Sequence, residues 1–354
     1  MEKNIAERNK MLQRFLLILF CSFLLIPGIS NAGEIRLVDR NEREVVLQKE
    51  AKRVVSLMQE CTTVMLTLGA GDQLVGVDKH SASDKLNGLV RFKENPVVSV
   101  GETKQPNLEL IVSLKPDLIL TWGGYGTDLA NEIQKHTGVP VMCLHTLTTI
   151  DGVKANYSLV GRAIGKQQRM QALLDYGDAS IESITKLTHA IPEEKRPRVH
   201  LLFWGFWNGV SRIPIYYDPV TIAGGVNIAS GQTSNVYGYS VKVPVEQVVV
   251  WNPDFIFIHG SPSWAKVTPN KVMSDPRMQN VTAVKNRNVD YTLGMWRGWH
   301  YPRALTETIY MAKKMHPELF KSLDPRSKGD EIYEFFYGKP GLWSARGKEL
   351  GLLQ

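Results

Sequence analysis

Aromatic, histidine and arginine side chains stand directly after most of the strand-like runs of this sequence. Ligands of open α/β sheets bind at the carboxyl ends of the strands. Indole and phenol rings at that edge suit a large ligand with apolar faces, and a few Arg and His side chains suit anionic or metal-bound groups. The candidate ligand-binding residues are Met58, Trp122, Tyr125, His145, Trp207, Tyr217, Tyr237, Tyr239, His259, Trp264, Trp296, Arg297 and His300.

Four of these candidates have an alternative role. The guanidinium fork of Arg297 matches a carboxylate or a chelate oxygen, and a surface salt bridge is its alternative. His145 and His259 follow strands in different halves of the chain, so they could face each other across a cleft and touch a bound metal. A partly buried, hydrogen-bonded histidine is the alternative for each. Met58 belongs either to the core or to the cleft.

Catalytic motifs are missing from the sequence. Neither a G-x-S-x-G elbow nor an H-E-x-x-H pair occurs. The stretch "GRAIGKQ" departs from a phosphate-binding loop, because its glycine spacing is short and Gln167 follows Lys166. We therefore expect no enzyme and no cofactor, with an exported enzyme as a remote alternative.

Two simpler ligands stay open. Bare Zn²⁺ or Mn²⁺ needs three or four converging His, Asp or Glu ligands. His80, His145, His259 and His300 could converge, but the sequence has no His-rich loop and the indoles would then have no role. An oxyanion such as molybdate would instead need a small dry pocket of Arg, Tyr and backbone N–H groups.

The elements that must position these residues occur twice. Residues 107–124 read "NLELIVSLKPDLILTWGG" and residues 244–261 read "PVEQVVVWNPDFIFIHGS", with Glu, Pro and Asp at matching places. Each copy predicts a short helix, a break at proline and a buried strand. Because strands alternate with helices, we expect parallel pairing through right-handed crossovers. The predicted fold class is α/β, with two similar lobes of mainly parallel sheets and a ligand cleft between them.

The N-terminus predicts export. Residues 1–32 have basic residues, then an uncharged apolar run over 15–26, and a small-residue cleavage site ending at Ala32. The run is shorter than the roughly 20 residues of a membrane-spanning helix. A lipid anchor at Cys21 is less favoured, because Phe20 precedes it and the apolar run continues. We expect a periplasmic protein.

Composition and length set further bounds. The net charge is +7, and the basic residues are scattered along the chain without a long Lys/Arg block. This distribution argues against nucleic-acid binding and permits an anionic ligand. Two buried thiols are favoured for Cys61 and Cys143, and one bridge between them stays open. The predicted units are an N-terminal lobe over 33–150, a helical segment over 151–190, and a C-terminal lobe over 191–354 whose C-terminal extension has no assigned role.

These motifs resemble the class III substrate-binding proteins of ABC importers, which deliver iron–siderophore, haem and cobalamin. The resemblance spans most of residues 52–316 and implies that residues 166–190 form a single long helix joining the lobes. The matching stretches are "RVVSL", "LTLGAGDQLVGV", "PNLELIVSLKPDLIL", "AGGVNIASG", "VEQVVVWNPDFIFI" and "MWRGWHYPRALTETI".

The resemblance also implies a role for the two repeated glutamates. Each lobe of such a protein docks one acidic residue onto an arginine pocket of the permease, and the matching positions are Glu109 and Glu246. Favourable contact with a helix dipole would alone explain either residue. We expect a monomer that captures a metal chelate, a ferric siderophore or similar iron complex, and passes it to an ABC permease dimer. A molybdate-type oxyanion, cobalamin, haem and a bare metal ion are the alternatives.

Overall fold

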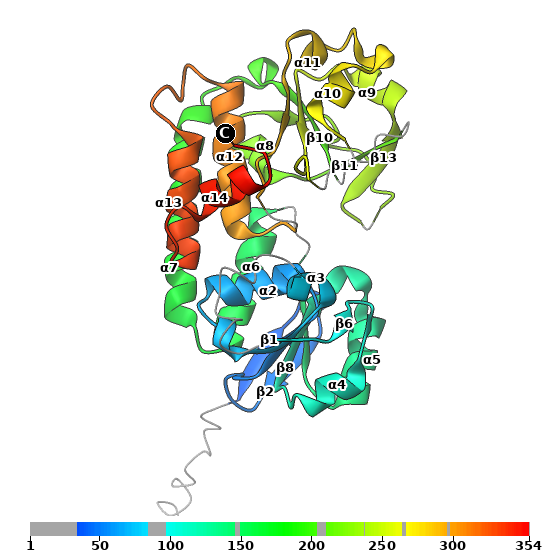
Figure 1. The fold of residues 1–354 in the computed structure, drawn as a ribbon, viewed down its shortest axis with the longest axis vertical. Coiled ribbons are helices and arrows are strands. Elements are labelled where there is room, and N and C mark those ends of the chain that lie inside the picture. The colour runs from blue at the N-terminus through cyan, green and yellow to red at the C-terminus, as the bar shows by residue number, and fades with distance from the viewer. Residues whose placement is uncertain are drawn as a thin grey trace, which may run out of the picture.

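The computed structural model describes residues 34–83, 97–145, 149–203, 210–236, 238–263, 267–295 and 298–353. The predicted signal peptide at residues 1–32 lies outside these ranges. Within them, two parallel sheets stand at opposite ends of the molecule, with helices between and beside them (Figure 1). The α/β prediction with mainly parallel sheets is confirmed.

The N-terminal sheet has five parallel strands among the described residues. Its short central runs are apolar and buried on both faces, as parallel strands covered by helices require. In spatial order the strands are β5 (Val98–Ser99), β4 (Leu74–Val77), β3 (Val54–Ser56), β8 (Leu118–Trp122) and β9 (Val141–Leu144). Helices α2 (Gln59–Thr67), α3 (Lys79–Ser83), α4 (Leu108–Ser113) and α5 (Thr127–Thr137) accompany them, with antiparallel pairs β1 (Ile35–Val38) with β2 (Glu44–Leu47) and β6 (Gly101–Glu102) with β7 (Gln105–Pro106).

The C-terminal sheet repeats this plan with four described parallel strands. In spatial order they are β12 (Val226–Asn227), β10 (Arg198–Leu202), β14 (Phe255–Ile258) and β15 (Val289–Tyr291). Beside it, β11 (Val210–Pro214) and β13 (Ser240–Pro244) form an antiparallel pair. The accompanying helices are α8 (Asp218–Ile222), α9 (Val245–Trp251), α10 (Pro269–Met273) and α11 (Thr282–Lys285).

The repeated aspartate accepts an equivalent hydrogen bond in both halves. The Asp117 carboxylate accepts a hydrogen bond from the backbone N–H of Arg53 at 2.9 Å, next to the start of β3. The Asp254 carboxylate accepts one from the backbone N–H of Arg198 at 2.8 Å, at the start of β10. In each half the aspartate therefore joins the strand that follows the short helix to its neighbour in the sheet.

Long helices connect the two sheets. The linking helix expected over 166–190 runs as α7 (Gln167–Thr188), whose 22 residues span about 33 Å at about 1.5 Å each. Figure 1 shows α7 and α13 side by side along one edge of the molecule. The helices of this layer are α6 (Ile150–Ala163), α7, α12 (Tyr301–Met315), α13 (Pro325–Tyr337) and α14 (Leu342–Glu349).

The C-terminal extension packs onto this layer. The ring of Phe335 in α13 stacks on Tyr176 of α7, with centroids 4.1 Å apart. Arg169 of α7 donates to the carbonyls of Phe335 at 2.5 Å and of Thr67 in α2 at 3.3 Å. The extension therefore ties the linking helix to the N-terminal half. The domain boundaries themselves stay predictions.

One apolar core runs through the connecting helices. It joins buried residues of the N-terminal sheet, such as Leu120, through Leu173 of α7 and Leu305 of α12 to Val199 of the C-terminal sheet. Cys61 and Cys143 are both buried, and both thiols are free. Across the described ranges, no helix combines the length and apolarity needed to cross a bilayer.

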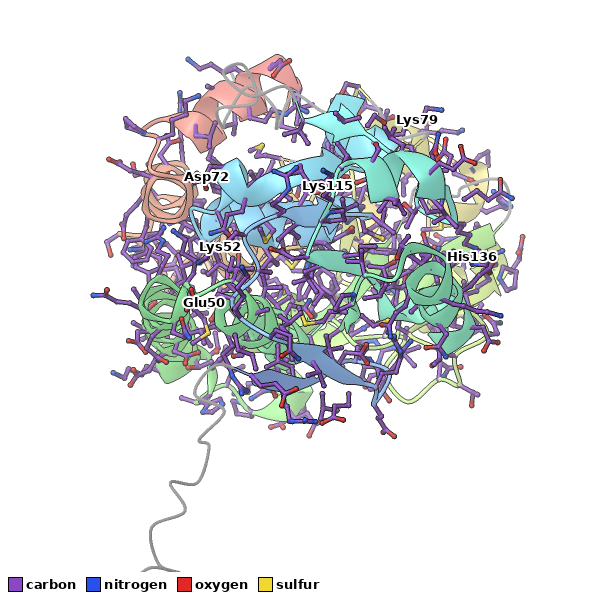
Figure 2. All side chains as sticks on the ribbon, turned by 90° about the horizontal axis from the view of Figure 1, so that it is seen from below. Glu50, Lys52, Asp72, Lys79, Lys115 and His136 are labelled. Carbon is purple, nitrogen blue, oxygen red and sulfur yellow. The ribbon has the colours of Figure 1, made fainter. Side chains whose placement is uncertain are left out.

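Charges of both signs are interspersed at the N-terminal end of the molecule. Viewed from below, this face carries Glu50, Lys52, Asp72 and Lys115 among its labelled side chains (Figure 2). Glu50 and Lys52 form an exposed ion pair at 2.8 Å. Such a mixture is typical of a solvated surface. Because positive and negative side chains alternate, this face offers no uniform electrostatic potential that would attract a large charged partner.

Candidate functional site

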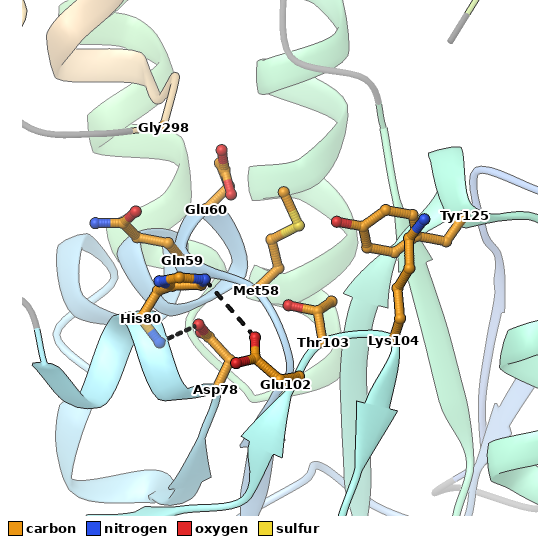
Figure 3. Close-up of a pocket in the computed structure, with 10 residues that line it drawn as sticks. All are labelled: Met58, Gln59, Glu60, Asp78, His80, Glu102, Thr103, Lys104, Tyr125 and Gly298. Atoms are coloured by element: carbon orange, nitrogen blue, oxygen red, sulfur yellow. Dashed lines mark hydrogen bonds and ion pairs between the residues drawn. The ribbon is translucent and has the colours of Figure 1, made fainter. Parts of the chain in front are cut away.

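A pocket of about 420 Å³ opens where the N-terminal sheet faces the segment before α12 (Figure 3). Its walls come from the ends of β3 and β4, from the β6–β7 pair, and from one backbone position of the C-terminal half. This is the strand edge at which ligands of α/β proteins gather. The lining residues are Met58, Gln59, Glu60, Asp78, His80, Glu102, Thr103, Lys104, Tyr125 and Gly298.

The floor of the pocket is built by α2 and α3. Met58 precedes α2 with extended backbone (φ −151°), which places Gln59 and Glu60 in the first helical turn. The hydroxyl of Ser56 lies 2.8 Å from that of Thr62, which lies 3.0 Å from that of Ser81. This buried hydroxyl chain ends on Asp78, to which Ser81 donates. The floor is therefore fixed by hydrogen bonds before any ligand arrives.

Tyr125 and Lys104 form one wall. The Tyr125 ring meets Trp122 edge to face, with centroids 4.7 Å apart, and the Lys104 ammonium lies 4.8 Å above the same ring. A Cβ at Gly124 would stand 2.4 Å from the Trp122 ring, so only glycine permits this indole to pack against its own loop. Of the candidates chosen from the sequence, Met58 and Tyr125 line the pocket, and the Trp122 ring packs against that of Tyr125.

Glu60 has the most perturbed environment in the pocket. Burial raises the pKa of its carboxyl to about 7, although hydrogen bonds from its own backbone N–H and from the backbone N–H of Trp299 lower it. The negative charge of Asp78 raises this pKa further, and Arg303 lowers it. Glu60 therefore changes its charge close to neutral pH.

Three predicted ligand residues lie inside the C-terminal half, in a buried polar network around Arg303. The Arg303 guanidinium donates to Glu307 at 2.8 Å, lies 2.8 Å from Nδ1 of His259, and reaches the Gly298 carbonyl at 2.9 Å. The hydroxyl of Tyr217 donates to the Glu307 carboxylate and accepts from the Trp299 indole at 3.0 Å.

His300 caps α12 within the same network. Its Nδ1 accepts from the backbone N–H of Arg303 at 3.4 Å. Burial lowers the pKa of His300 to about 3, and it lowers that of His259 well below its usual value. Both imidazoles are neutral at physiological pH. His259 and His300 lie in the interior, and neither is among the side chains that line the pocket.

Tyr239 and His145 lie elsewhere. The hydroxyl of Tyr239 accepts from Arg212 at 2.7 Å, beside β13. His145 is half-buried after β9, with its backbone N–H donating to Asn156 at 2.6 Å. Desolvation, reinforced by Arg40, lowers the pKa of His145. The remaining predicted residues, Trp207, Tyr237, Trp264, Trp296 and Arg297, lie outside the described residues.

Glu109 and Glu246 occupy equivalent places in the two halves. Each is exposed in the first turn of its short helix, α4 or α9. The Glu246 carboxylate lies 3.5 Å from the Arg277 guanidinium, which holds Asp275 more closely at 2.7 Å. Both glutamates are thus on the surface, where a partner can reach them.

Sequence reasoning missed most of the pocket's charged lining. Asp78 follows β4 directly, so the rule used for the other strands would have found it. Glu102, Thr103 and Lys104 belong to a tight hairpin of two-residue strands, which carries no hydrophobic alternation to detect. Among the described side chains, no group of three His, Cys, Asp or Glu residues is placed to hold a metal ion.

Two parallel-sheet halves are joined by α7, and a pocket lies at the strand ends of the N-terminal half, against Gly298 of the other half. This arrangement agrees with the sequence comparison. A profile of the periplasmic binding protein family matches residues 54–293. The chain belongs to this family. As a periplasmic binding protein, it is the solute-binding component of an ABC importer.

Relatives of this periplasmic binding protein have different ligands in their names. The molybdate-binding protein MolA of Haemophilus influenzae is 22% identical, over 85% of this chain and 90% of its own. The Fe(3+)-citrate-binding protein YfmC of Bacillus subtilis is 25% identical, over 74% of this chain and 79% of its own. The structure of MolA bound to molybdate superposes with a TM-score of 0.72 at 20% identity, covering 86% of this chain and 98% of that one, which shows a shared fold.

Proposed function

We propose that this periplasmic binding protein captures a metal chelate, a ferric siderophore or a similar iron complex. The observation that carries the proposal is the pocket. Its volume of about 420 Å³ falls within the range of roughly 300–1,000 Å³ typical of small-molecule sites. A tetrahedral oxyanion would fill a small part of that space. An organic chelate is large enough to contact both the apolar surface of the pocket, from the Met58 thioether and the Tyr125 ring, and its polar groups.

The charges of the lining support the same choice. Three carboxylates, Glu60, Asp78 and Glu102, face the pocket together with Lys104 and His80. Carboxylates repel a bare dianion, and replacing its hydration shell with them is costly. A chelate shields its metal inside organic groups and can present neutral or cationic ones to the wall. A mixed polar and aromatic lining suits such a surface.

A molybdate-type oxyanion is the second candidate. The similarity of this chain to the molybdate-binding protein MolA, in sequence and in fold, supports this candidate. Cobalamin, haem and a bare metal ion stay as further alternatives. Delivery to the permease is proposed to use Glu109 and Glu246, with the protein acting as a monomer in the periplasm.

Tryptophan fluorescence tests the choice of ligand. Trp122 contacts Tyr125 of the pocket, so a chelate bound there should quench its emission. We expect saturable quenching by a ferric chelate such as ferrioxamine B and none by ZnCl₂. Quenching by sodium molybdate alone would reject the iron chelate and favour the oxyanion. Quenching by ZnCl₂ alone would favour direct metal capture.

A further inference from the structure

Two of the three pocket carboxylates are already engaged by the chain. Asp78 accepts hydrogen bonds from the backbone N–H of His80 at 2.9 Å and from that of Ser81 at 3.1 Å, besides the Ser81 hydroxyl. Glu102 lies 3.0 Å from the Lys79 ammonium. It also lies 3.8 Å from the His80 ring (Figure 3). Asp78 is thus satisfied by hydrogen bonds from neutral groups, and Glu102 by the Lys79 cation, all at the start of α3.

Glu60 is the third carboxylate, and it differs. Its side chain is buried, with 9% of the residue exposed, and its Oε2 has no hydrogen-bond partner within the described chain. Figure 3 shows the carboxyl group extending from α2 toward the segment that carries Gly298. A Cβ at Gly298 (φ +69°) would stand 2.7 Å from Oε1, so the carboxyl group fits against bare backbone of the opposite half.

A buried carboxyl oxygen without a partner is costly. Leaving such a group unsatisfied costs about 1–3 kcal/mol, and more when it is charged. An apolar residue at position 60 would avoid this cost. The other polar groups of the floor, from Ser56 to Asp78, are hydrogen-bonded to one another and do not need Glu60. The unused acceptor is explained if a ligand group completes it.

We propose that Glu60 is a ligand-contacting residue, and that its Oε2 accepts a hydrogen bond from a cationic or N–H group on the bound chelate. The inference rests on the proposed function and narrows it to chelates that carry such a group outside the coordination sphere of the metal. Glu60 belongs to the N-terminal half and Gly298 to the C-terminal half, so the contact sits where both halves meet the ligand.

Ferrioxamine B and its N-acetyl derivative provide matched probes. They share one ferric hydroxamate centre, and only the first has a free ammonium group. With the wild-type protein at pH 8, we expect ferrioxamine B to bind at least about tenfold more tightly than the acetylated probe, the lower end of what a hydrogen bond to a charged group contributes. The Glu60→Gln variant, which keeps the side-chain shape without the charge, should bind both probes equally.

The pH dependence supplies a second readout. The titratable or charged groups around Glu60 are Asp78, Glu102, His80, Lys104 and, from α12, Arg303. A carboxyl whose pKa is raised to about 7 is ionised at pH 8 and mostly protonated at pH 6. Affinity of the wild-type protein for ferrioxamine B should therefore fall from pH 8 to pH 6. The profile of Glu60→Gln should lose this fall.

Controls separate the possible failures. Glu50→Gln removes a surface carboxylate that does not line the pocket, and it should behave as wild type. Glu60→Asp keeps the charge and should keep part of the preference, which guards against a folding defect in Glu60→Gln. Equal affinity of the wild-type protein for both probes would overturn the inference and leave the proposed function standing. Absence of binding by any ferric chelate would overturn both.

Discussion

Lys115 and Asn252 adopt almost the same left-handed backbone conformation, with φ of +49° and +46°, at matching places in the two halves. Each lies within two residues of the end of a short helix, immediately before the repeated Pro-Asp pair. The conformation turns the chain from helix into strand, and it is the backbone counterpart of the sequence repeat. Asparagine tolerates this region, whereas lysine pays a steric cost in it.

Exchanging the two residue types should therefore change the free energy of unfolding in opposite directions at the two positions. Lys115→Asn is expected to raise the free energy of unfolding by about 0.5–1 kcal/mol, because Asn adopts the left-handed region more readily. Asn252→Lys should lower it by about 1–3 kcal/mol, because it also removes the acceptor for the Thr282 N–H at 2.8 Å. Urea unfolding of each variant measures both values. Destabilisation by Lys115→Asn would show that the lysine conformation carries no strain.

Permease docking predicts a separation of binding from transport. In the double variant Glu109→Ala with Glu246→Ala, ligand affinity should match that of wild type while uptake is abolished. Both side chains are exposed and lie outside the lining of the pocket. Glu182→Ala with Glu318→Ala removes two other exposed glutamates, at 63% and 82% side-chain exposure, and should transport normally. Normal uptake by the first double variant would reject the docking role.

The buried Arg303–Glu307 pair predicts a strong, non-additive effect on stability. Both side chains are fully buried and 2.8 Å apart. Arg303→Met leaves the Glu307 charge without its partner and should lower the free energy of unfolding by about 3–5 kcal/mol. Adding Glu307→Leu should restore part of that loss, because the lone charge is removed. Equal or greater loss in the double variant, measured by chemical denaturation, would contradict this account.

We expect His300 to account for part of the loss of folding stability at acidic pH. Its pKa is lowered to about 3 by burial, against about 6.5 in an unfolded chain, so the folded state holds it neutral. The associated stability is complete above pH 6.5 and is lost as the pH falls from 6.5 toward 3, by at most about 1.4 kcal/mol per pH unit. His300→Asn keeps a helix-capping side chain that does not titrate. Its unfolding free energy should depend less steeply on pH in this window, and an unchanged slope would argue against a neutral His300.

The pocket shows where sequence reasoning reaches its limit. Met58 and Tyr125 could be chosen because each stands just after a strand, and parallel strands bring such positions to one edge. The same rule also selected Tyr217, His259 and His300, which the structure buries around Arg303. A position after a strand specifies an edge of the sheet. Whether the side chain turns outward or inward depends on the partners that reach it from other elements.

The sequence by itself determined the α/β architecture, its duplication and the family, because hydrophobic runs, proline breaks and their spacing are local patterns that survive in one dimension. Only the tertiary structure decided that Glu60, Asp78 and Lys104 share a pocket with Gly298. Their proximity depends on how a hairpin, two helices and a distant backbone segment pack together. The raised pKa of Glu60 has the same origin, since desolvation by the opposite half cannot be read from its neighbours in the chain.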